Sequence, residues 1–196
     1  GKSSYFGATP EKLAKFSNGK IEIDALAGSA PRGKDENEDK QIEEKLLSGS
    51  NKNLTEHKLV ADYIKQAVSP HVSNLKVEKE NSIKKLANIQ HLWTTISAEL
   101  DNSQSIFNIL NELYPSPAIC GYPKEEAYHR IKKIENYKRG LYSGILGWFN
   151  LNDNGEFVVA IRSALTYGNK LIAFAGNGIV EDSDPDQEYE ETELKL

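Results

Sequence analysis

Apolar residues in this sequence follow helical spacing in one region and strand-like patterns in others, without regular alternation between the two. Helical spacing predicts three helices in the middle of the chain, over residues 59–68, 103–113 and 123–134. Strand-like patterns bounded by turn residues cover residues 20–27, 143–149, 156–165 and 171–175. Because a doubly wound sheet requires strands and helices to alternate, this order predicts an α+β fold.

Turn residues mark the ends of these predicted elements. Asn18-Gly19 predicts a tight hairpin turn before the first strand, and two further Asn- and Gly-containing turns separate three sequential antiparallel strands near the C-terminus. Pro70 ends the first predicted helix because proline has no backbone N–H to continue it. Residues 30–39 are rich in charged residues, Pro and Gly and lack apolar periodicity, which predicts an exposed, mobile loop.

Composition and charge exclude several classes of protein. With 38% hydrophobic and 27% charged residues over 196 positions, the chain is typical of one globular domain. A net charge of −5 without a concentrated basic stripe argues against nucleic acid and favours a small-molecule partner. The longest apolar runs are far shorter than the ~20 residues needed to cross a bilayer, so no membrane span is expected.

The cysteine content and the first residues bear on location and completeness. Cys120 is the only cysteine, so no intrachain disulfide can form, and no signal-peptide pattern opens the chain. Both features predict a cytoplasmic protein. The sequence has no methionine and opens on the apolar-aromatic phrase Tyr5-Phe6-Gly7, which predicts that it is a fragment of a longer protein.

Two glycine- or acid-rich segments could bind charged ligands, and each has a structural alternative. Gly176-Asn177-Gly178 follows a predicted strand, where exposed backbone N–H groups could bind an anion; the alternative is a simple tight turn. The acidic residues near the C-terminus could bind a hard cation such as Mg²⁺ through their carboxylates, or form a solvated helix face. They are Glu188, Glu190, Glu191 and Glu193.

Three further positions have the same ambiguity. Glu56, beside His57 at the start of a predicted helix, could bind metal or favour the helix N-terminus through the helix dipole. Arg162 lies in an apolar stretch read as a buried strand, where it could pair with a structural acid or bind a ligand carboxylate. His91, next to Trp93, fits a packed histidine as well as a catalytic one.

Considered together, a series of phrases in this sequence resembles the family of chorismate-utilising enzymes, which includes anthranilate, isochorismate and salicylate synthases. The resemblance runs in order along nearly the whole chain. The phrases that carry it are Phe6-Gly7-Ala8-Thr9-Pro10-Glu11, residues 25–33, Glu56-His57, Gln90-His91-Leu92, residues 115–118 with 121–123, residues 139–144, Ala160-Ile161-Arg162, residues 175–180 and residues 188–195.

The resemblance implies a fold, an active site and a metal. The expected architecture is that of anthranilate synthase, with packed antiparallel sheets and outer helices, and residues 1–196 form the C-terminal portion of the chorismate-binding catalytic domain. Glu11 matches the family's general acid, which acts at the C4 hydroxyl of chorismate. Glu56 and Glu191 match the Mg²⁺ ligands, with Glu188 close by. The oligomeric state is left open.

The same resemblance implies how the substrate is held. Tyr142, Arg162 and Lys195 match positions that bind the carboxylates of chorismate, and the backbone of Gly176, Asn177 and Gly178 offers N–H donors beside them. His91 matches a residue that lines the pocket. The remaining positions assigned to substrate binding are Gly28, Ser29 and Ala118.

The phrase Pro115-Ser116-Pro117-Ala118 distinguishes branches of the family. Relatives that use ammonia carry Pro-Ala-Gly-Thr there, so Ala118 stands where they have a hydroxyl. The phrase is similar to the Pro-Thr-Pro-Ala of isochorismate synthases, which predicts an isomerase that adds water at C2 of chorismate as the C4 hydroxyl leaves. The alternatives are salicylate synthase, anthranilate or aminodeoxychorismate synthase, and a chorismate-binding fragment without turnover.

Two features depart from the family pattern. The family's Lys-Asp pair before the first metal-binding glutamate is Lys52-Asn53 here, which removes one carboxylate from the metal region. The lysine that activates water in isochorismate synthases precedes the Gly7 phrase and is not among these residues. The 196 residues alone are therefore expected to be inactive, and the pathway, menaquinone or siderophore, stays open.

Overall fold

The Asn18-Gly19 turn forms the hairpin that the sequence predicts. Both residues have positive φ, 51° and 73°, which is the backbone of a type I′ turn and is accessible to Asn and Gly at low cost. The turn joins β2 (Lys12–Ser17) to β3 (Lys20–Pro31). β3 is longer than expected because its backbone continues to pair with β5 as far as Pro31.

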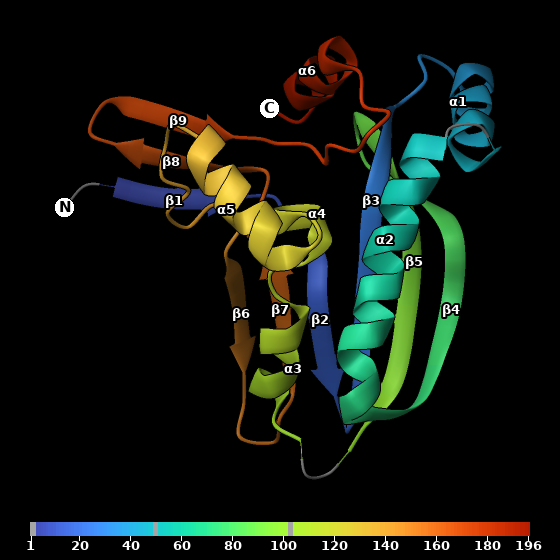
Figure 1. Cartoon of the computed structure of the whole chain (residues 1–196), viewed down its shortest axis with the longest axis vertical. Helices are drawn as coiled ribbons and strands as arrows, with labels where there is room; N and C mark the ends of the chain where they lie inside the picture. The colour runs from blue at the N-terminus through green and yellow to red at the C-terminus, as the bar shows by residue number, and fades with distance from the viewer. Residues whose placement is uncertain (1–2, 49–50, 102–103) are drawn as a thin grey trace.

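Two antiparallel sheets form the framework of the protein (Figure 1). The structure is a computed structural model that describes residues 3–48, 51–101 and 104–196. One sheet has six strands in the order β4-β5-β3-β2-β7-β6, and the other has three in the order β1-β8-β9. The remaining strands are β1 (Ser3–Gly7), β4 (Val72–Lys85), β5 (Ile89–Leu100), β6 (Ile145–Phe149), β7 (Gly155–Val159), β8 (Ser163–Tyr167) and β9 (Lys170–Phe174).

Helices cover the sheets from outside, which together with the antiparallel pairing confirms the α+β prediction. They are α1 (Glu36–Ser48), α2 (Asn51–Val68), the 3₁₀ turn η1 (Ser69–His71), α3 (Ile106–Leu113), α4 (Pro117–Cys120), α5 (Lys124–Ile134) and α6 (Pro185–Leu194). The three predicted helices correspond to the second half of α2, to α3 and to α5. None of the helices within residues 3–48, 51–101 and 104–196 combines the length and apolar composition that crossing a bilayer requires.

The main core lies between the six-stranded sheet and α2, with α3 at one side. Ile21, Ile23 and Ala25 alternate along β3 and pack with Val60 and Ile64 of α2, and all five side chains are buried. Full burial of each large aliphatic side chain contributes about 1.5–3 kcal/mol. This packing holds α2 along β3 and β5, so the start of α2 and the end of β3 lie at the same end of the sheet (Figure 1).

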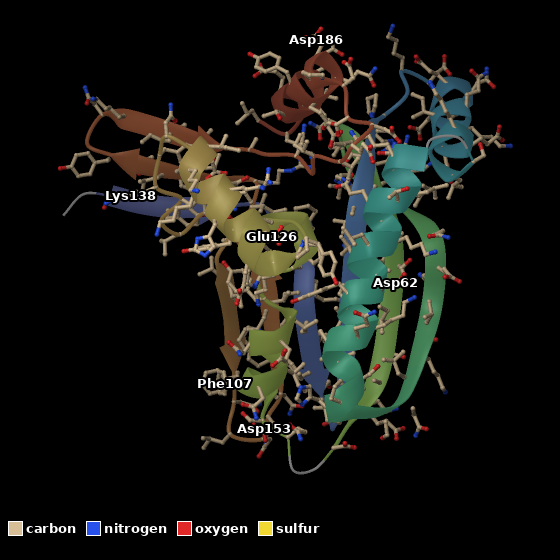
Figure 2. All side chains as sticks on the ribbon, in the orientation of Figure 1. Asp62, Phe107, Glu126, Lys138, Asp153 and Asp186 are labelled. Carbon is tan, nitrogen blue, oxygen red and sulfur yellow. The ribbon has the colours of Figure 1, made fainter. Side chains whose placement is uncertain are left out.

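Aromatic side chains fix α3 against the opposite edge strand. Phe107, labelled in Figure 2, meets Phe149 of β6 edge to face, with ring centroids 5.0 Å apart. Both rings are about half exposed. This contact draws α3 over the β6 side of the sheet, whereas α2 covers the β3 side.

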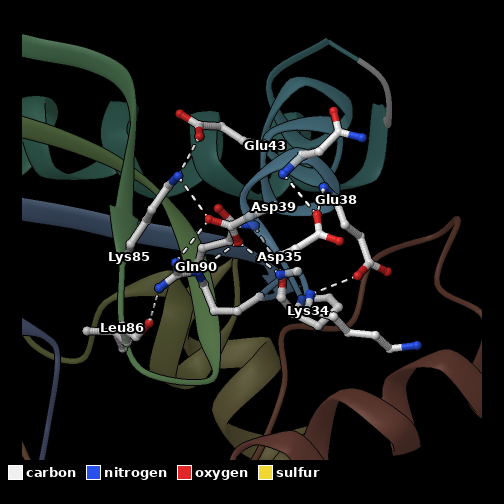
Figure 3. A network of polar contacts seen from close by, with 12 residues as sticks. Lys34, Asp35, Glu38, Asp39, Glu43, Lys85, Leu86 and Gln90 are labelled. Carbon is white, nitrogen blue, oxygen red and sulfur yellow. Dashed lines mark hydrogen bonds and ion pairs between the residues drawn. The ribbon is translucent and has the colours of Figure 1, made fainter.

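Residues 30–39 are not the mobile loop that their composition predicts. β3 continues into this segment and α1 begins within it. Arg32 donates from Nε and Nη2 to the two carboxylate oxygens of Asp39 at 2.8 and 3.0 Å, and Lys85 contacts the same carboxylate at 3.1 Å (Figure 3). The guanidinium hydrogen bonds hold the pKa of Asp39 well below its usual range. Ion pairing therefore orders a segment whose sequence lacks apolar anchors.

The single strand predicted over residues 156–165 is two strands in different sheets. β7 belongs to the six-stranded sheet and β8 to the three-stranded sheet, and the chain crosses between them at residues 160–162. Arg162 has a φ of +49° there, which interrupts the extended backbone. The prediction that Arg162 lies within a buried strand is therefore wrong.

Candidate functional site

The crossing between the two sheets brings Arg162 next to the segment that precedes Glu11. The backbone N–H of Ala8 donates to the carbonyl of Arg162 at 3.0 Å. A side chain at Gly7 would place its Cβ only 2.9 Å from that same carbonyl oxygen, so the close approach requires glycine. The Arg162 guanidinium lies 3.4 Å from Nε2 of His91 on β5. Residues far apart in the sequence thus meet at the junction of the sheets.

A cavity of about 360 Å³ opens at this junction, within the size range of small-molecule sites. Every residue that the family resemblance assigns to the site lines it, except Glu191; Glu190 and Glu193, the other acidic residues near the C-terminus, are not part of the lining either. The lining candidates are Glu11, Gly28, Ser29, Glu56, His91, Ala118, Tyr142, Arg162, Gly176, Asn177, Gly178, Glu188 and Lys195. The structure therefore brings these residues together, while their chemical roles stay predictions.

Glu11 is a buried carboxyl of the cavity, with only 7% of the residue exposed. Burial raises its pKa from 4.5 to about 7, and the nearby charges of Lys195 and Lys84 offset part of that effect. A carboxyl with this pKa is about half protonated at neutral pH. Glu11 therefore meets the physical requirement for a general acid.

His91 and Arg162 lie side by side but differ in charge: His91 is neutral, and Arg162 is a permanent cation. Burial, together with the adjacent charge of Arg162, lowers the pKa of His91 to about 3, so its imidazole is neutral. Its Nδ1 lies 2.9 Å from the hydroxyl of Ser29. Burial also lowers the pKa of Arg162, but a guanidinium stays protonated in proteins. Arg162 thus supplies a permanent charge suited to a ligand carboxylate.

The glycine segment after β9 is fixed by α6 and by α2. Lys195 donates to the carbonyl of Gly176 at 3.2 Å and to Oδ1 of Asn177 at 2.6 Å. A Cβ on Gly178 would lie 2.9 Å from the carboxyl carbon of Glu56, so the backbone reaches this carboxylate only because residue 178 is glycine. The segment is therefore a close-packed wall of the cavity.

Tyr142 forms another wall of the cavity and meets the same segment. Its ring stacks on Phe174 of β9, with centroids 5.1 Å apart. A Cβ on Gly176 would lie 3.0 Å from the Tyr142 hydroxyl. Burial raises the pKa of Tyr142 to about 12, so the hydroxyl stays protonated and can donate to an anion.

Three carboxylates, Glu56, Glu188 and Glu191, gather where α2 meets α6. Burial and the charge of Glu191, followed by that of Glu188, raise the pKa of Glu56 to about 7. Glu188 is only 6% exposed. Acidic side chains this close together, one of them buried, fit the chemistry of a hard cation such as Mg²⁺.

Lysine ammonium groups lie among these carboxylates. Lys52 forms an ion pair with Glu188 and lies 4.0 Å from Glu191, and Lys195 lies 2.7 Å from Glu191. Across the described part of the chain, no three His, Cys, Asp or Glu side chains are grouped closely enough to form a complete metal site. Glu191 itself faces a neighbouring cavity and does not line the one described above.

Sequence reasoning missed one charged pair of the cavity wall. Arg139 donates from Nε to Oε2 of Glu135 at 2.8 Å and from Nη1 to the carbonyl of Ile119 at 3.0 Å. Both charged residues line the cavity, as does Ser143, whose hydroxyl Arg139 contacts at 3.2 Å. The spacing of four residues between Glu135 and Arg139 is a signal that could have predicted the pair.

The fold and the cavity define the class of protein. One small cavity beside an acidic cluster is lined by four kinds of polar group. They are the guanidinium of Arg162, the ammonium of Lys195, the neutral imidazole of His91 and the carboxyl of Glu11, whose pKa is near neutrality. This combination of groups is suited to binding a small anionic molecule and donating a proton to it. Comparison with known proteins names the family within this class.

The family profile described as chorismate binding enzyme matches residues 1–196, and the chain belongs to that family. It is 43% identical over 193 residues to isochorismate synthase MenF of Bacillus subtilis, covering 98% of this chain and 41% of the relative. It is 41% identical to the salicylate biosynthesis isochorismate synthase of Pseudomonas aeruginosa, covering 100% of this chain and 41% of the relative.

Solved structures agree with this membership. The crystal structure of Bacillus anthracis DhbC, assigned as a 2,3-dihydroxybenzoate-specific isochorismate synthase, superposes with a TM-score of 0.92 at 38% identity, covering 99% of this chain and 52% of that one. Anthranilate synthase component 1 of Saccharolobus solfataricus matches at 34% identity. The chain spans less than half the length of both isochorismate synthase relatives, 41% in each case.

Proposed function

We propose that this chain carries the chorismate site and the general acid of an isochorismate synthase, an isomerase that converts chorismate to isochorismate. The observation that carries this proposal is the cavity itself, where Glu11, with a pKa of about 7, faces the same space as Arg162 and Lys195. Chorismate has two carboxylates and a C4 hydroxyl, so it needs cations and a proton donor in one place. The cavity offers both.

The residues of the chain divide the work of the reaction. Arg162 and Lys195 neutralise and orient the carboxylates of the substrate, and the Tyr142 hydroxyl donates to one of them. Glu11 gives its proton to the C4 hydroxyl as that group leaves, which avoids expelling hydroxide. The neutral imidazole of His91, held by Ser29, provides a hydrogen-bonding wall without adding a second cation beside Arg162.

Mg²⁺ is part of the same proposal. Glu56, Glu188 and Glu191 would hold it, and when bound it would offset substrate charge and orient a carboxylate. The burial of Glu188, together with the raised pKa of Glu56 beside Glu191 and Glu188, supports this assignment. The ammonium groups of Lys52 and Lys195 contact these carboxylates, so a bound cation would compete with them.

Water rather than ammonia is the proposed nucleophile. Ala118 lines the cavity, and it offers no hydroxyl at a position where the ammonia-using branch carries threonine. The identity of 43% and 41% to two isochorismate synthases points the same way. The runner-up is a synthase that continues to salicylate, followed by anthranilate or aminodeoxychorismate synthase. The names of the relatives leave menaquinone, salicylate and siderophore pathways equally open for the product.

The test is product analysis with the whole protein that contains these residues. Incubation with chorismate and Mg²⁺, without ammonia or glutamine, is expected to give isochorismate as the main product by chromatography. Release of pyruvate together with salicylate would show that the protein is a salicylate synthase instead. Formation of anthranilate once ammonia is added would show that it is an anthranilate synthase. Omitting Mg²⁺ and adding a chelator is expected to abolish turnover, and full activity under these conditions would contradict the metal assignment.

A second candidate, a chorismate-binding fragment without turnover, applies to residues 1–196 taken alone. We assign no lysine among the described residues as the base that activates water. Large apolar side chains on the sheets are also exposed, including Trp148 at 58% and Leu171 at 61%. We expect the isolated chain to lack isochorismate synthase activity. Turnover near the rate of the whole protein would show that the base lies within these residues.

A further inference from the structure

A buried carboxylate and a lysine lie directly behind Glu11, on the strands of the six-stranded sheet. Lys84, near the end of β4, donates from Nζ to the carbonyl of Pro10 at 3.0 Å, and Pro10 immediately precedes Glu11. The same ammonium lies 3.6 Å from Oδ2 of Asp24 on β3. The Asp24 side chain is only 3% exposed, so its charge is screened little by water. None of the chemistry assigned so far uses either residue.

The position of Lys84 is well determined by its surroundings. Its cross-strand partner on β5 is His91, another residue of the cavity. Its ammonium lies 5.6 Å from the centre of the Trp93 ring, and Asp24 holds it from the side. Lys12, the residue after Glu11, lies 3.7 Å from the same Asp24 oxygen. The carboxylate of Asp24 is therefore flanked by two lysines, one bonded to the residue before Glu11 and one directly following Glu11.

We propose that Lys84 is a positioning residue for the general acid: held by Asp24, it fixes the backbone that carries Glu11 and acts on the Glu11 carboxyl as a neighbouring charge. This inference rests on the proposed function, in which Glu11 donates the proton. An isolated surface lysine would do neither, because its charge is screened and its side chain is not held.

The charged groups that act on Glu11 come from three parts of the chain. Lys195, directly after α6, and Lys84 of β4 lower its pKa, whereas Asp24 of β3 raises it. Other ionisable groups line the same cavity, namely Arg162, His91, Glu56, Glu188, Glu135, Arg139, Tyr137, Tyr142 and Tyr189. Removing the charge of Lys84 and removing the charge of Asp24 must therefore move the pKa of Glu11 in opposite directions. A purely structural role for the two residues would not produce opposite signs.

The experiment compares Lys84→Met, Asp24→Asn and a matched control in the whole protein. Lys79→Met is the control, since Lys79 lies on the same strand with its ammonium 4.7 Å from the centre of the same Trp93 ring, yet it makes no contact with Pro10. The readout is kcat/KM for chorismate between about pH 6 and 9, which reports the ionisation of the free enzyme. Thermal unfolding of each variant tests for loss of folding.

The expected shifts follow from the signs of the charges. Lys84→Met is expected to move the alkaline limb of kcat/KM upward by about half a pH unit or more, and Asp24→Asn to move it downward. Lys79→Met is expected to leave the limb in place. Loss of the bond to Pro10 is expected to lower the kcat of Lys84→Met about tenfold at the optimum, with KM little changed. Lys84→Arg, which keeps charge and donor, is expected to restore most of this loss.

Two outcomes would overturn the inference. Shifts of the same sign in Lys84→Met and Asp24→Asn, or no shift in either, would show that the pair is structural. Infrared difference titration of the wild type against Glu11→Gln measures the same ionisation without turnover. If the whole protein made no isochorismate, the proposed function would fail, and this titration in the Lys84 and Asp24 variants would still decide the role of Lys84.

Discussion

The pH dependence of turnover gives the most direct test of the Glu11 assignment. Burial raises the pKa of this carboxyl from 4.5 to about 7. At pH 7 about half of the carboxyls then carry a proton, compared with about 0.3% at the ordinary value, a gain of roughly 150-fold in the reactive form. Because the acid must be protonated to act, activity is retained below the raised pKa and lost as the pH rises through it.

The assay is kcat/KM for isochorismate formation by the whole protein, measured across the pH range and in two variants. We expect kcat/KM to fall about tenfold per unit above about pH 7. Glu11→Gln keeps the shape of the side chain but has no acidic proton, and it is expected to lower kcat by about 10²–10⁴ while chorismate still binds. Glu22→Gln is the control, because that carboxylate is 49% exposed on the neighbouring strand. A Glu11→Gln variant with a normal rate, or a wild-type profile flat to pH 9, would refute the reasoning.

Three further predictions follow from the geometry of the cavity and its surroundings. Gly178→Ala places a methyl group 2.9 Å from the carboxyl carbon of Glu56, so we expect weaker activation by Mg²⁺, read as a rise in the metal concentration for half-maximal rate. Arg162→Gln removes a half-buried cation of the cavity and is expected to raise KM for chorismate about 10–100-fold, in keeping with a charged hydrogen bond; an unchanged KM would contradict the carboxylate assignment. Asp39→Asn weakens the ion pairs with Arg32, so hydrogen exchange should accelerate in α1 and not in α2.

Local signals in the sequence were sufficient for the elements that carry their own apolar pattern or turn residues. The Asn18-Gly19 hairpin, the second half of α2, and the helices α3 and α5 all follow from them. β4 was missed because it is an edge strand with mostly exposed residues, among them several lysines, so it shows no apolar alternation. β5 was missed for the opposite reason, since it is buried on both faces and its apolar residues do not alternate cleanly.

Long-range contacts decide the features that local patterns could not predict. The segment 30–39 is ordered because Arg32, directly after β3, and Lys85 of β4 share the carboxylate of Asp39, and no spacing within the segment reveals a partner 46 positions away. Likewise, the apolar character of residues 156–165 is continuous, but β7 and β8 pair with strands of different sheets. A pattern read along one strand does not indicate a change of sheet.

The candidate site was predictable as a set of residues only through resemblance to a family. Taken one at a time, Glu56, Arg162 and the acidic residues of α6 could each be explained by a structural role as simply as by a role in ligand binding. The structure brings them to one cavity, yet it leaves Glu191 outside the lining and places Lys52 among the carboxylates. No sequence motif predicts the contacts of Lys84 and Asp24 with the Glu11 segment, because these contacts depend on the register of four strands.

The backbone at Arg162 explains why the break between β7 and β8 lies where it does. A non-glycine residue with φ near +49° costs roughly 1–2 kcal/mol relative to the extended backbone on either side. Glycine would remove that cost, but it would also remove the guanidinium that lies 3.4 Å from His91 in the cavity. The carbonyl of Arg162 offsets part of the strain, since it accepts the N–H of Ala8 and so fixes the segment leading to Glu11. The strained residue Arg162 therefore places its guanidinium in the cavity and, through its backbone carbonyl, fixes the segment that leads to Glu11. This gives a functional reason for strain at this position.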